Sequence, residues 1–131
     1  MNDAKMFLSN NATIMYSDFV ASLIKKFPDY RLELCHAAMG VSGEAGELSD
    51  AIKRNAIYGK PADVDNIVEE LGDLEFYMQD IRAKYGITRQ QTLQANISKL
   101  EKRYIDLSYS DEAAIARADK NNVIDNVEDQ S

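Results

Sequence analysis

Residues 43–47 have the sequence Gly-Glu-Ala-Gly-Glu, and residues 70–73 have the sequence Glu-Leu-Gly-Asp. In each stretch two carboxylates lie three positions apart, a spacing that places both on one face of an α-helix, about one turn apart. Hard divalent cations bind such carboxylate oxygens. The pattern raises two hypotheses: a metal site presented by two helices, and a helical domain whose acids are solvated.

The regions around these stretches are predicted to be helical. Apolar residues recur at helical spacing, Gly and Pro residues interrupt them, and no stretch shows the alternation of a half-buried strand. Four amphipathic helices with short joints indicate an all-α fold, a four-helix core bundle with a short C-terminal helix. The predicted helices span residues 13–27, 31–57, 62–85, 88–107 and 110–118.

Cap and stop residues set the predicted helix ends. Pro28 ends the first helix, and Gly86 ends the third. Thr88 and Gln91 have the spacing of a capping box at the start of the fourth helix. Ser110 is the predicted cap of the short fifth helix.

The length and charge of the chain limit its class. Its 131 residues fit one domain. We expect that domain to span residues 1–118, followed by a flexible acidic tail over residues 119–131 that is poor in apolar side chains. The net charge of −7 repels a nucleic-acid backbone, which argues against a non-specific nucleic-acid binder. A nucleotide polyphosphate would need cations to approach such a surface.

Cysteine usage and hydropathy indicate a cytoplasmic protein. Cys35 is the single cysteine and His36 the single histidine, too few for a Cys/His zinc site within one chain. As neighbours they point about 100° apart on a helix, which disfavours a Cys–His nucleophilic pair. No apolar run reaches the roughly 20 residues of a membrane span, and the N-terminus lacks the long apolar region of a signal peptide.

The two acid pairs border the predicted buried faces of adjacent helices. Glu44 lies beside the apolar stripe of residues 31–57, and Glu70 and Asp73 lie beside that of residues 62–85. Because a short turn joins the two helices, they should pack antiparallel, and the acids lie at similar distances from that turn. Four clustered carboxylates would stay partly protonated unless a metal fills the site. Mg²⁺ suits a site shared between carboxylates and phosphates.

Glycines accompany the first acid pair. Gly40, Gly43 and Gly46 lie within a predicted helix, where each costs about 1 kcal/mol of helix stability relative to Ala. Two reasons could offset this cost: close packing against another helix, and room for a ligand beside the acids.

Hydrogen-bond donors share one face of the helix predicted over residues 88–107. Asn96, Lys99 and Arg103 are spaced by three and four positions. Lys99 and Arg103 suit phosphates, and Asn96 could donate to a sugar or base. Tyr77 could stack or hydrogen-bond. The alternatives are an ordinary solvated face and, for Tyr77, a half-buried aromatic residue.

A di-iron centre is the main rival for a metal site in a helical bundle. It requires Glu-x-x-His on two helices. Glu33 and His36 supply one such motif, but the chain has no second histidine. Neither a P-loop, a nucleophile elbow nor a dinucleotide-binding fingerprint is present.

Three blocks in order resemble the MazG-like family of all-α nucleoside triphosphate pyrophosphohydrolases. They are His36-Ala-Ala-Met-Gly-Val-Ser-Gly-Glu-Ala-Gly-Glu-Leu48, Glu69-Glu-Leu-Gly-Asp-Leu74 and Asn96-Ile-Ser-Lys-Leu-Glu-Lys-Arg-Tyr104. The similarity covers about residues 14–118 and is closest to the short single-domain members.

The resemblance implies hydrolysis of a (deoxy)nucleoside triphosphate between the α and β phosphates, in a nucleotide house-cleaning role. It implies catalytic metal ligands that hold Mg²⁺, with Mn²⁺ able to substitute, and residues that contact the nucleotide. It also implies a homodimer or homotetramer with sites assembled across subunits. The metal ligands would be Glu44, Glu47, Glu70 and Asp73, and the nucleotide contacts Asn96, Lys99, Arg103, His36 and Tyr77.

Two departures bear on base selection. Gly43 precedes Glu44 where many members carry a double acid, and Phe76-Tyr77 stands where many carry Trp. The rival function is a catalytically silent nucleotide-sensing or helical interaction module.

Overall fold

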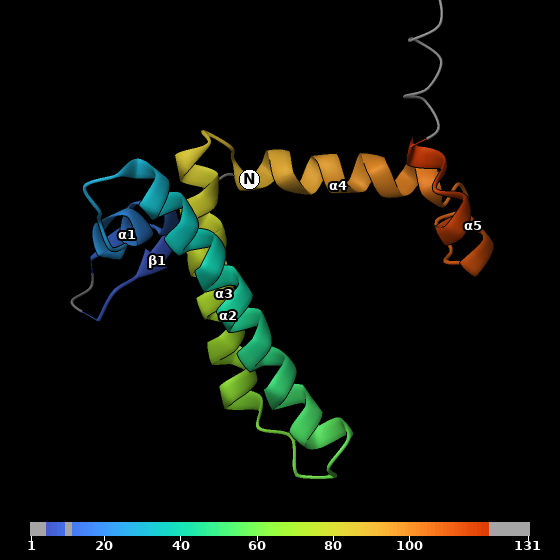
Figure 1. The fold of residues 1–131 in the computed structure, drawn as a ribbon, viewed down its shortest axis with the longest axis horizontal. Helices are drawn as coiled ribbons and strands as arrows, with labels where there is room; N and C mark the ends of the chain where they lie inside the picture. The colour runs from blue at the N-terminus through green and yellow to red at the C-terminus, as the bar shows by residue number, and fades with distance from the viewer. Residues whose placement is uncertain (1–4, 10–11, 121–131) are drawn as a thin grey trace, which may run out of the picture. The chain divides into compact units, whose positions relative to one another are not determined.

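The computed structural model describes residues 5–9 and 12–120. The chain divides into two compact units, residues 1–89 and 90–131, and each is described by itself (Figure 1). The single domain predicted over residues 1–118 stays a prediction. Of the predicted tail, residues 121–131 lie outside the described residues.

The first unit begins with a small hairpin that the sequence pattern did not predict. Strand β1 (Lys5–Phe7) pairs antiparallel with β2 (Thr13–Met15), and Met6 lies opposite Ile14. Three-residue strands are too short to show an alternating pattern. The hairpin takes the first three residues of the predicted helix 13–27.

Helix α1 (Tyr16–Leu23) is therefore shorter than predicted at both ends. Ile24 has extended backbone angles (φ −61°, ψ 136°) and is buried. The chain after it is drawn to the next helix, because the N–H of Phe27 donates to Glu33 Oε1 at 3.1 Å and the Phe27 ring lies 5.3 Å from the His36 ring. Pro28 thus follows the helix end by five positions instead of causing it.

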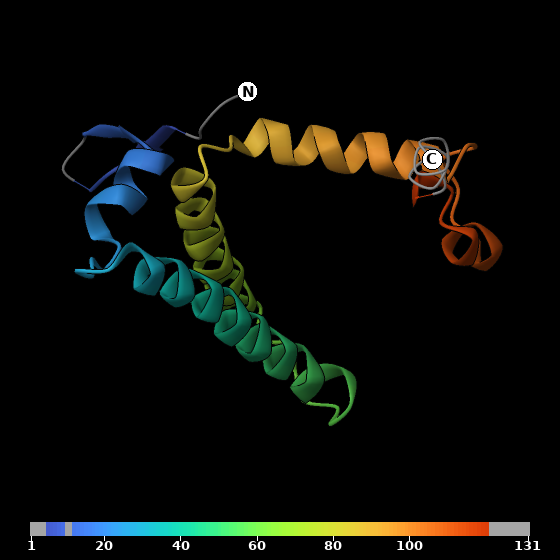
Figure 2. The same cartoon turned by 45° about the horizontal axis from the view of Figure 1, so that its top comes forward.

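Helices α2 (Tyr30–Ala56) and α3 (Val64–Lys84) form an antiparallel pair, packed side by side along their lengths (Figure 2). Asp29 caps α2 by accepting from the N–H of Arg31, and Asp63 caps α3 by accepting from the N–H of Asn66. Helix α1 packs against α3. The pair carries both acidic stretches.

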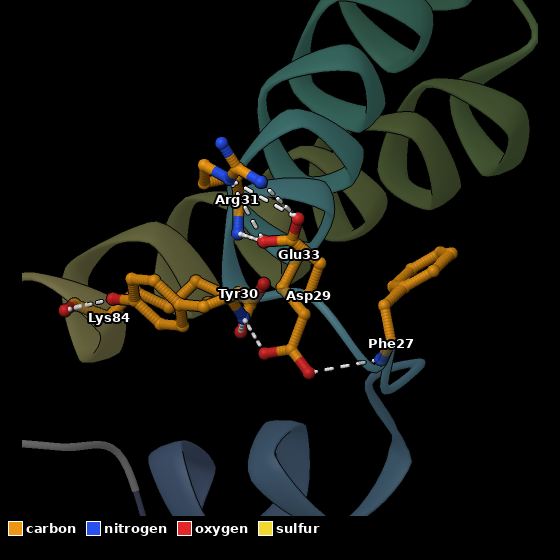
Figure 3. A network of polar contacts seen from close by, with 7 residues as sticks. Phe27, Asp29, Tyr30, Arg31, Glu33 and Lys84 are labelled. Atoms are coloured by element: carbon orange, nitrogen blue, oxygen red, sulfur yellow. Dashed lines mark hydrogen bonds and ion pairs between the residues drawn. The ribbon is translucent and has the colours of Figure 1, made fainter.

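A polar cluster joins the start of α2 to the end of α3 (Figure 3). The Tyr30 hydroxyl donates to the carbonyl of Lys84 at 2.7 Å. The Lys84 ammonium lies 2.5 Å from Asp80 and 3.7 Å from Glu33, and its side chain is only 6% exposed. Two carboxylates thus surround one buried cation, which satisfies the pairing that a buried charge needs.

The end of α3 follows the predicted stop. Gly86 has φ +64°, and the N–H of Ile87 donates to the carbonyl of Arg82 at 2.8 Å. Glycine adopts this left-handed conformation without a steric penalty, and the bond closes the helix as in a Schellman motif.

Helix α4 (Arg89–Arg103) begins at the last residue of the first unit, and the rest of it lies in the second unit with α5 (Asp111–Ala116) and a 3₁₀ turn, η1 (Ala118–Lys120). Ser110 caps α5 as predicted, since its side chain accepts from the N–H of Ala113 at 3.1 Å. Arg103 binds Asp119 through two hydrogen bonds of 2.8 and 3.1 Å, which tie η1 to the end of α4.

The predicted all-α fold with a short C-terminal helix is confirmed. Few apolar residues are buried in the described part of the chain, and the apolar stripes predicted within residues 31–57 and 62–85 are mostly half-buried. Across the described residues the buried hydrophobic set is Val20, Ile24, Ala37 and Ala51. No helix in the described part of the chain is long and apolar enough to cross a membrane.

Candidate functional site

Three glutamates converge between α2 and α3. Glu44, Glu47 and Glu70 each offer one carboxylate oxygen, and these oxygens lie within 4.8 Å of one another. Glu70 is buried, Glu44 is half-buried and Glu47 is exposed. The cluster follows from helical spacing, because Glu44 and Glu47 share a face of α2 that meets Glu70 on the antiparallel α3.

The charges in this cluster disfavour one another. Burial raises the pKa of Glu44, and the charges of Asp73 and Glu47 raise it further, while a hydrogen bond from Glu70 opposes the shift. Burial also raises the pKa of Glu70, with added repulsion first from Glu47 and then from Glu44. Such shifts mark a place where a cation would be stabilised.

Asp73 is the fourth predicted ligand. It is exposed, and it is not one of the residues whose oxygens converge. Its charge nevertheless contributes to the raised pKa of both Glu44 and Glu70. Its role as a metal ligand stays a prediction.

A pocket of about 550 Å³ opens beside the acids, toward the loop that joins α2 and α3. Two predicted ligands, Glu47 and Glu70, lie in its wall. Residues that the sequence analysis did not assign to the site also line it. Among its lining residues are Gly43, Gly46, Asp50, Arg54 and Asn66.

These additional residues had a signal in the sequence. Asp50 and Arg54 follow Glu47 by three and seven positions, so they share its helix face. Asn66 precedes Glu70 by four positions and shares its face on α3 in the same way. Spacing showed the faces, but it could not show that a pocket lies between them.

The glycines divide into two kinds. A Cβ on Gly40 would come within 2.4–2.5 Å of the Tyr77 ring, so this glycine permits close packing of α3 on α2. Gly43 and Gly46 have open space where a Cβ would be, and both line the pocket. Both reasons expected for the glycines therefore have a counterpart in the structure.

His36 and Tyr77 lie together on the side of the acids away from the pocket. Their rings are 5.7 Å apart at 67°, and the His36 ring also lies 5.3 Å from Phe27. His36 Nδ1 is buried without a hydrogen-bond partner. The two residues form an aromatic surface with an unused polar atom, and their contact with a nucleotide stays a prediction.

The predicted donor residues lie on α4 of the second unit. Asn96 and Lys99 are exposed, whereas the Arg103 side chain is 18% exposed and paired with Asp119. The hydrogen bond with Asp119 raises the pKa of Arg103 and lowers that of Asp119. Contact of Asn96, Lys99 and Arg103 with the nucleotide stays a prediction.

The converging donors are all of one chemical type. All three converging groups are carboxylates, the ligands of Mg²⁺, Mn²⁺ and Ca²⁺. The Glu-x-x-His motif does not join a metal cluster among the described residues, because Glu33 binds the N–H of Phe27 and pairs with Lys84. The three converging carboxylates could therefore hold a divalent cation, and no histidine joins them among the described residues.

Comparison with known protein families gives a match over more than half of the chain. The family model described as the MazG nucleotide pyrophosphohydrolase domain matches residues 36–107, more than half of the 131 residues. The match includes the three converging glutamates, Asp73 and the donor face of α4. No curated protein and no solved structure matches.

Proposed function

The chain belongs to the MazG nucleotide pyrophosphohydrolase family, and from this premise we propose that it hydrolyses (deoxy)nucleoside triphosphates between the α and β phosphates. The products are a nucleoside monophosphate and pyrophosphate. The observation that carries the proposal is the convergence of Glu44, Glu47 and Glu70 at the edge of a pocket of about 550 Å³.

A divalent cation is part of this proposal. Glu44, Glu47 and Glu70, with Asp73 beside them, would hold Mg²⁺, for which Mn²⁺ can substitute. When bound, the metal supplies charge neutralisation of the phosphates and an acidified water. The raised pKa values of Glu44 and Glu70 support the proposal, since a bound cation would relieve the repulsion among these groups.

The protein's other residues orient the substrate. The half-buried aromatic rings of Tyr77 and His36 offer a surface for the nucleoside, and His36 Nδ1 is an unpaired polar atom within it. We assign Asn96, Lys99 and Arg103 to nucleotide contacts because they resemble the family's third block and lie within the residues that the family model matches. We therefore propose that the base lies beside Tyr77 and His36, on the aromatic side of the acids.

A second copy of the chain is the proposed partner, in a homodimer or homotetramer. Few of the described apolar residues of the first unit are buried, while large apolar residues on α2 and α3 remain exposed. Apolar surface of this kind is typical of protein–protein interfaces. The exposed set includes Leu32, Ile52, Val64, Val68 and Leu71.

We place this activity in the cytoplasm, in nucleotide house-cleaning, with a free nucleotide and not a nucleic acid as substrate. The net charge of −7 supports that choice, because an acidic surface repels a polyanionic backbone but admits a metal-complexed nucleotide.

The deciding experiment measures pyrophosphate release with Mg²⁺ across the standard and common modified (d)NTPs. We expect release from at least one of them, together with the matching monophosphate. Release of inorganic phosphate in place of pyrophosphate would contradict cleavage between the α and β phosphates. Nucleotide binding with Mg²⁺ but no turnover of any substrate would favour the silent sensing module.

A further inference from the structure

Arg54 lies in the wall of the pocket that also contains Glu47 and Glu70. It follows Glu47 by seven positions on α2, about 10 Å along the helix axis. Helical side chains lean toward the N-terminus of their helix, so the Arg54 guanidinium extends back toward the acids. Its Nη2 lies 2.9 Å from Asp50 Oδ2, which is one turn nearer to Glu47. The pocket therefore has carboxylates at one end and a guanidinium toward the other.

The Arg54 guanidinium is available to a polyanion. Its partner Asp50 is exposed, with side-chain exposures of 66% for Arg54 and 51% for Asp50. Exposed pairs of this kind contribute little to stability, so a phosphate can replace Asp50 as the partner of Arg54. Both recorded bonds, from Nε and Nη2, go to a single oxygen of Asp50. By contrast, Arg103 in the second unit is 18% exposed and its partner Asp119 is 2% exposed.

The order of residues along α2 and α3 shows which residues lie on each side of the acid cluster. On α2, His36 comes before the acids and Arg54 after them. On the antiparallel α3 the order is reversed, with Asn66 before Glu70 and Tyr77 after it. The aromatic side and the Arg54 side are therefore at opposite ends of the acid cluster. A triphosphate whose nucleoside lies at Tyr77 directs its terminal phosphates toward Arg54 and Asn66.

We propose that Arg54 and Asn66 form the subsite for the β and γ phosphates, the part of the substrate that leaves as pyrophosphate. The inference rests on the proposed function and extends it to named residues of the first unit. Arginine suits this role because its planar fork binds two phosphate oxygens at once. The Asn66 side chain adds an amide N–H donor from the facing helix.

The test measures the binding of inorganic pyrophosphate, with Mg²⁺, by calorimetry to the full chain and three variants. Arg54→Gln should weaken binding about tenfold or more, since it removes a charge-assisted hydrogen bond. Asn66→Ala should weaken it by a smaller factor. Arg31→Gln is the matched control, because Arg31 is also an exposed arginine of α2, paired with Asp29 at 2.8 Å, and does not line the pocket. Its affinity should equal that of the wild type.

A second readout uses the products separately. Arg54→Gln should lose affinity for pyrophosphate while its affinity for the nucleoside monophosphate is unchanged. Equal loss for both products would indicate a general change of the site and would overturn the subsite, as would wild-type affinity of Arg54→Gln for pyrophosphate. Failure of the wild type to bind pyrophosphate would overturn it as well.

The outcomes separate this inference from the proposed function. Pyrophosphate release by the wild type, with product binding that does not depend on Arg54, refutes the subsite and leaves the activity standing. Arg54-dependent pyrophosphate binding by a chain that hydrolyses no (d)NTP refutes the activity and supports the subsite. Arg54 is exposed, so its replacement should leave the fold intact, which circular dichroism can check.

Discussion

The ring of Tyr77 lies against the backbone of Gly40, so closely that a Cβ on that residue would be 2.4 Å from the ring's Cδ1. The contact brings the ring within 5.7 Å of the His36 ring. One missing side chain on α2 thus fixes the position of an aromatic residue on α3, next to the acid cluster.

Gly40→Ala should destabilise the protein, although alanine is the better helix former. The added methyl would displace the Tyr77 ring, and overpacking of this kind costs about 1–3 kcal/mol. Gly43→Ala is the control, because a Cβ there meets open space, and the change should stabilise α2 by about 1 kcal/mol. Urea denaturation measures both. Equal free energies of unfolding for the two variants would contradict the role assigned to the contact.

Glu47→Gln and Asp73→Asn should each abolish pyrophosphate release without unfolding the chain. Both residues are exposed, so their loss leaves the packing unchanged. Each substitution removes a carboxylate that we propose as a ligand of the metal. The bound metal stabilises the transition state by several kcal/mol. The expected fall in kcat is about 100-fold or more. Glu101→Gln, an exposed acid on α4, serves as control and should retain activity.

Glu70→Gln should make the metal-free protein more stable at neutral pH. Burial, followed by repulsion from Glu47, raises the pKa of Glu70, so the folded chain holds this proton more tightly than the unfolded chain. The favourable contribution of Glu70 is present below its ordinary pKa and is lost as the pH rises through the raised value. Thermal unfolding of the wild type and of Glu70→Gln should show a higher melting temperature for the variant at neutral pH. This difference in melting temperature should vanish in acid. A melting temperature of Glu70→Gln below that of the wild type at neutral pH would contradict this prediction.

Removal of divalent metal should lower the melting temperature of the wild type. A ligand at 100 times its Kd stabilises the folded state by about 2.7 kcal/mol. Because protons compete with the metal for Glu44 and Glu70, the shift that Mg²⁺ produces should shrink as the pH falls. Glu47→Gln, which lacks one of the converging carboxylates, should show a smaller shift at every pH. A chelator titration followed by calorimetry measures all three effects.

Acid should weaken the ion pair of the second unit, whereas it relieves the repulsion at Glu70 in the first unit. The hydrogen bond from Arg103 lowers the pKa of Asp119, so its stabilising contribution is present above the ordinary pKa of about 3.8 and is lost as the pH falls through the lowered value. Asp119→Asn should speed hydrogen exchange at the end of α4 at neutral pH, and the difference should disappear in acid. Unchanged exchange at neutral pH would show that the pair does not hold η1 in place.

Helical spacing predicted the helices of this chain well because they are long and amphipathic. The faces of α2 and α3 followed from the positions of Glu44, Glu47 and Glu70, which the structure brings together. The hairpin of β1 and β2 was missed because three-residue strands carry no pattern. The end of α1 was wrong because Phe27 is drawn toward α2, a tertiary contact that leaves no local signal.

The polar interior was also beyond sequence reasoning. Asp80 and Arg82 are buried in α3 although their residue type is typical of surfaces. Each is accommodated by a specific partner, Lys84 for Asp80 and Gln79 for Arg82. Spacing of three and four positions places each partner on the same helix face, but periodicity does not report that these polar groups are buried in the folded chain. The sequence did not assign Arg54 to the candidate site, because no sequence pattern indicates that a pocket lies beside a helix.

Helix α2 runs without a break from Tyr30 to Ala56, and this continuity restricts how its sequence can change in length. Each residue inserted or deleted within an α-helix turns everything beyond it by about 100°. A deletion between Glu47 and Arg54 would carry the arginine off the face it shares with the acid, whereas the loop at residues 57–63 can lengthen or shorten without that rotation. The segment between Glu47 and Arg54 should therefore tolerate substitutions but not insertions or deletions. The spacing of seven positions should be retained even where most residues within the segment are replaced.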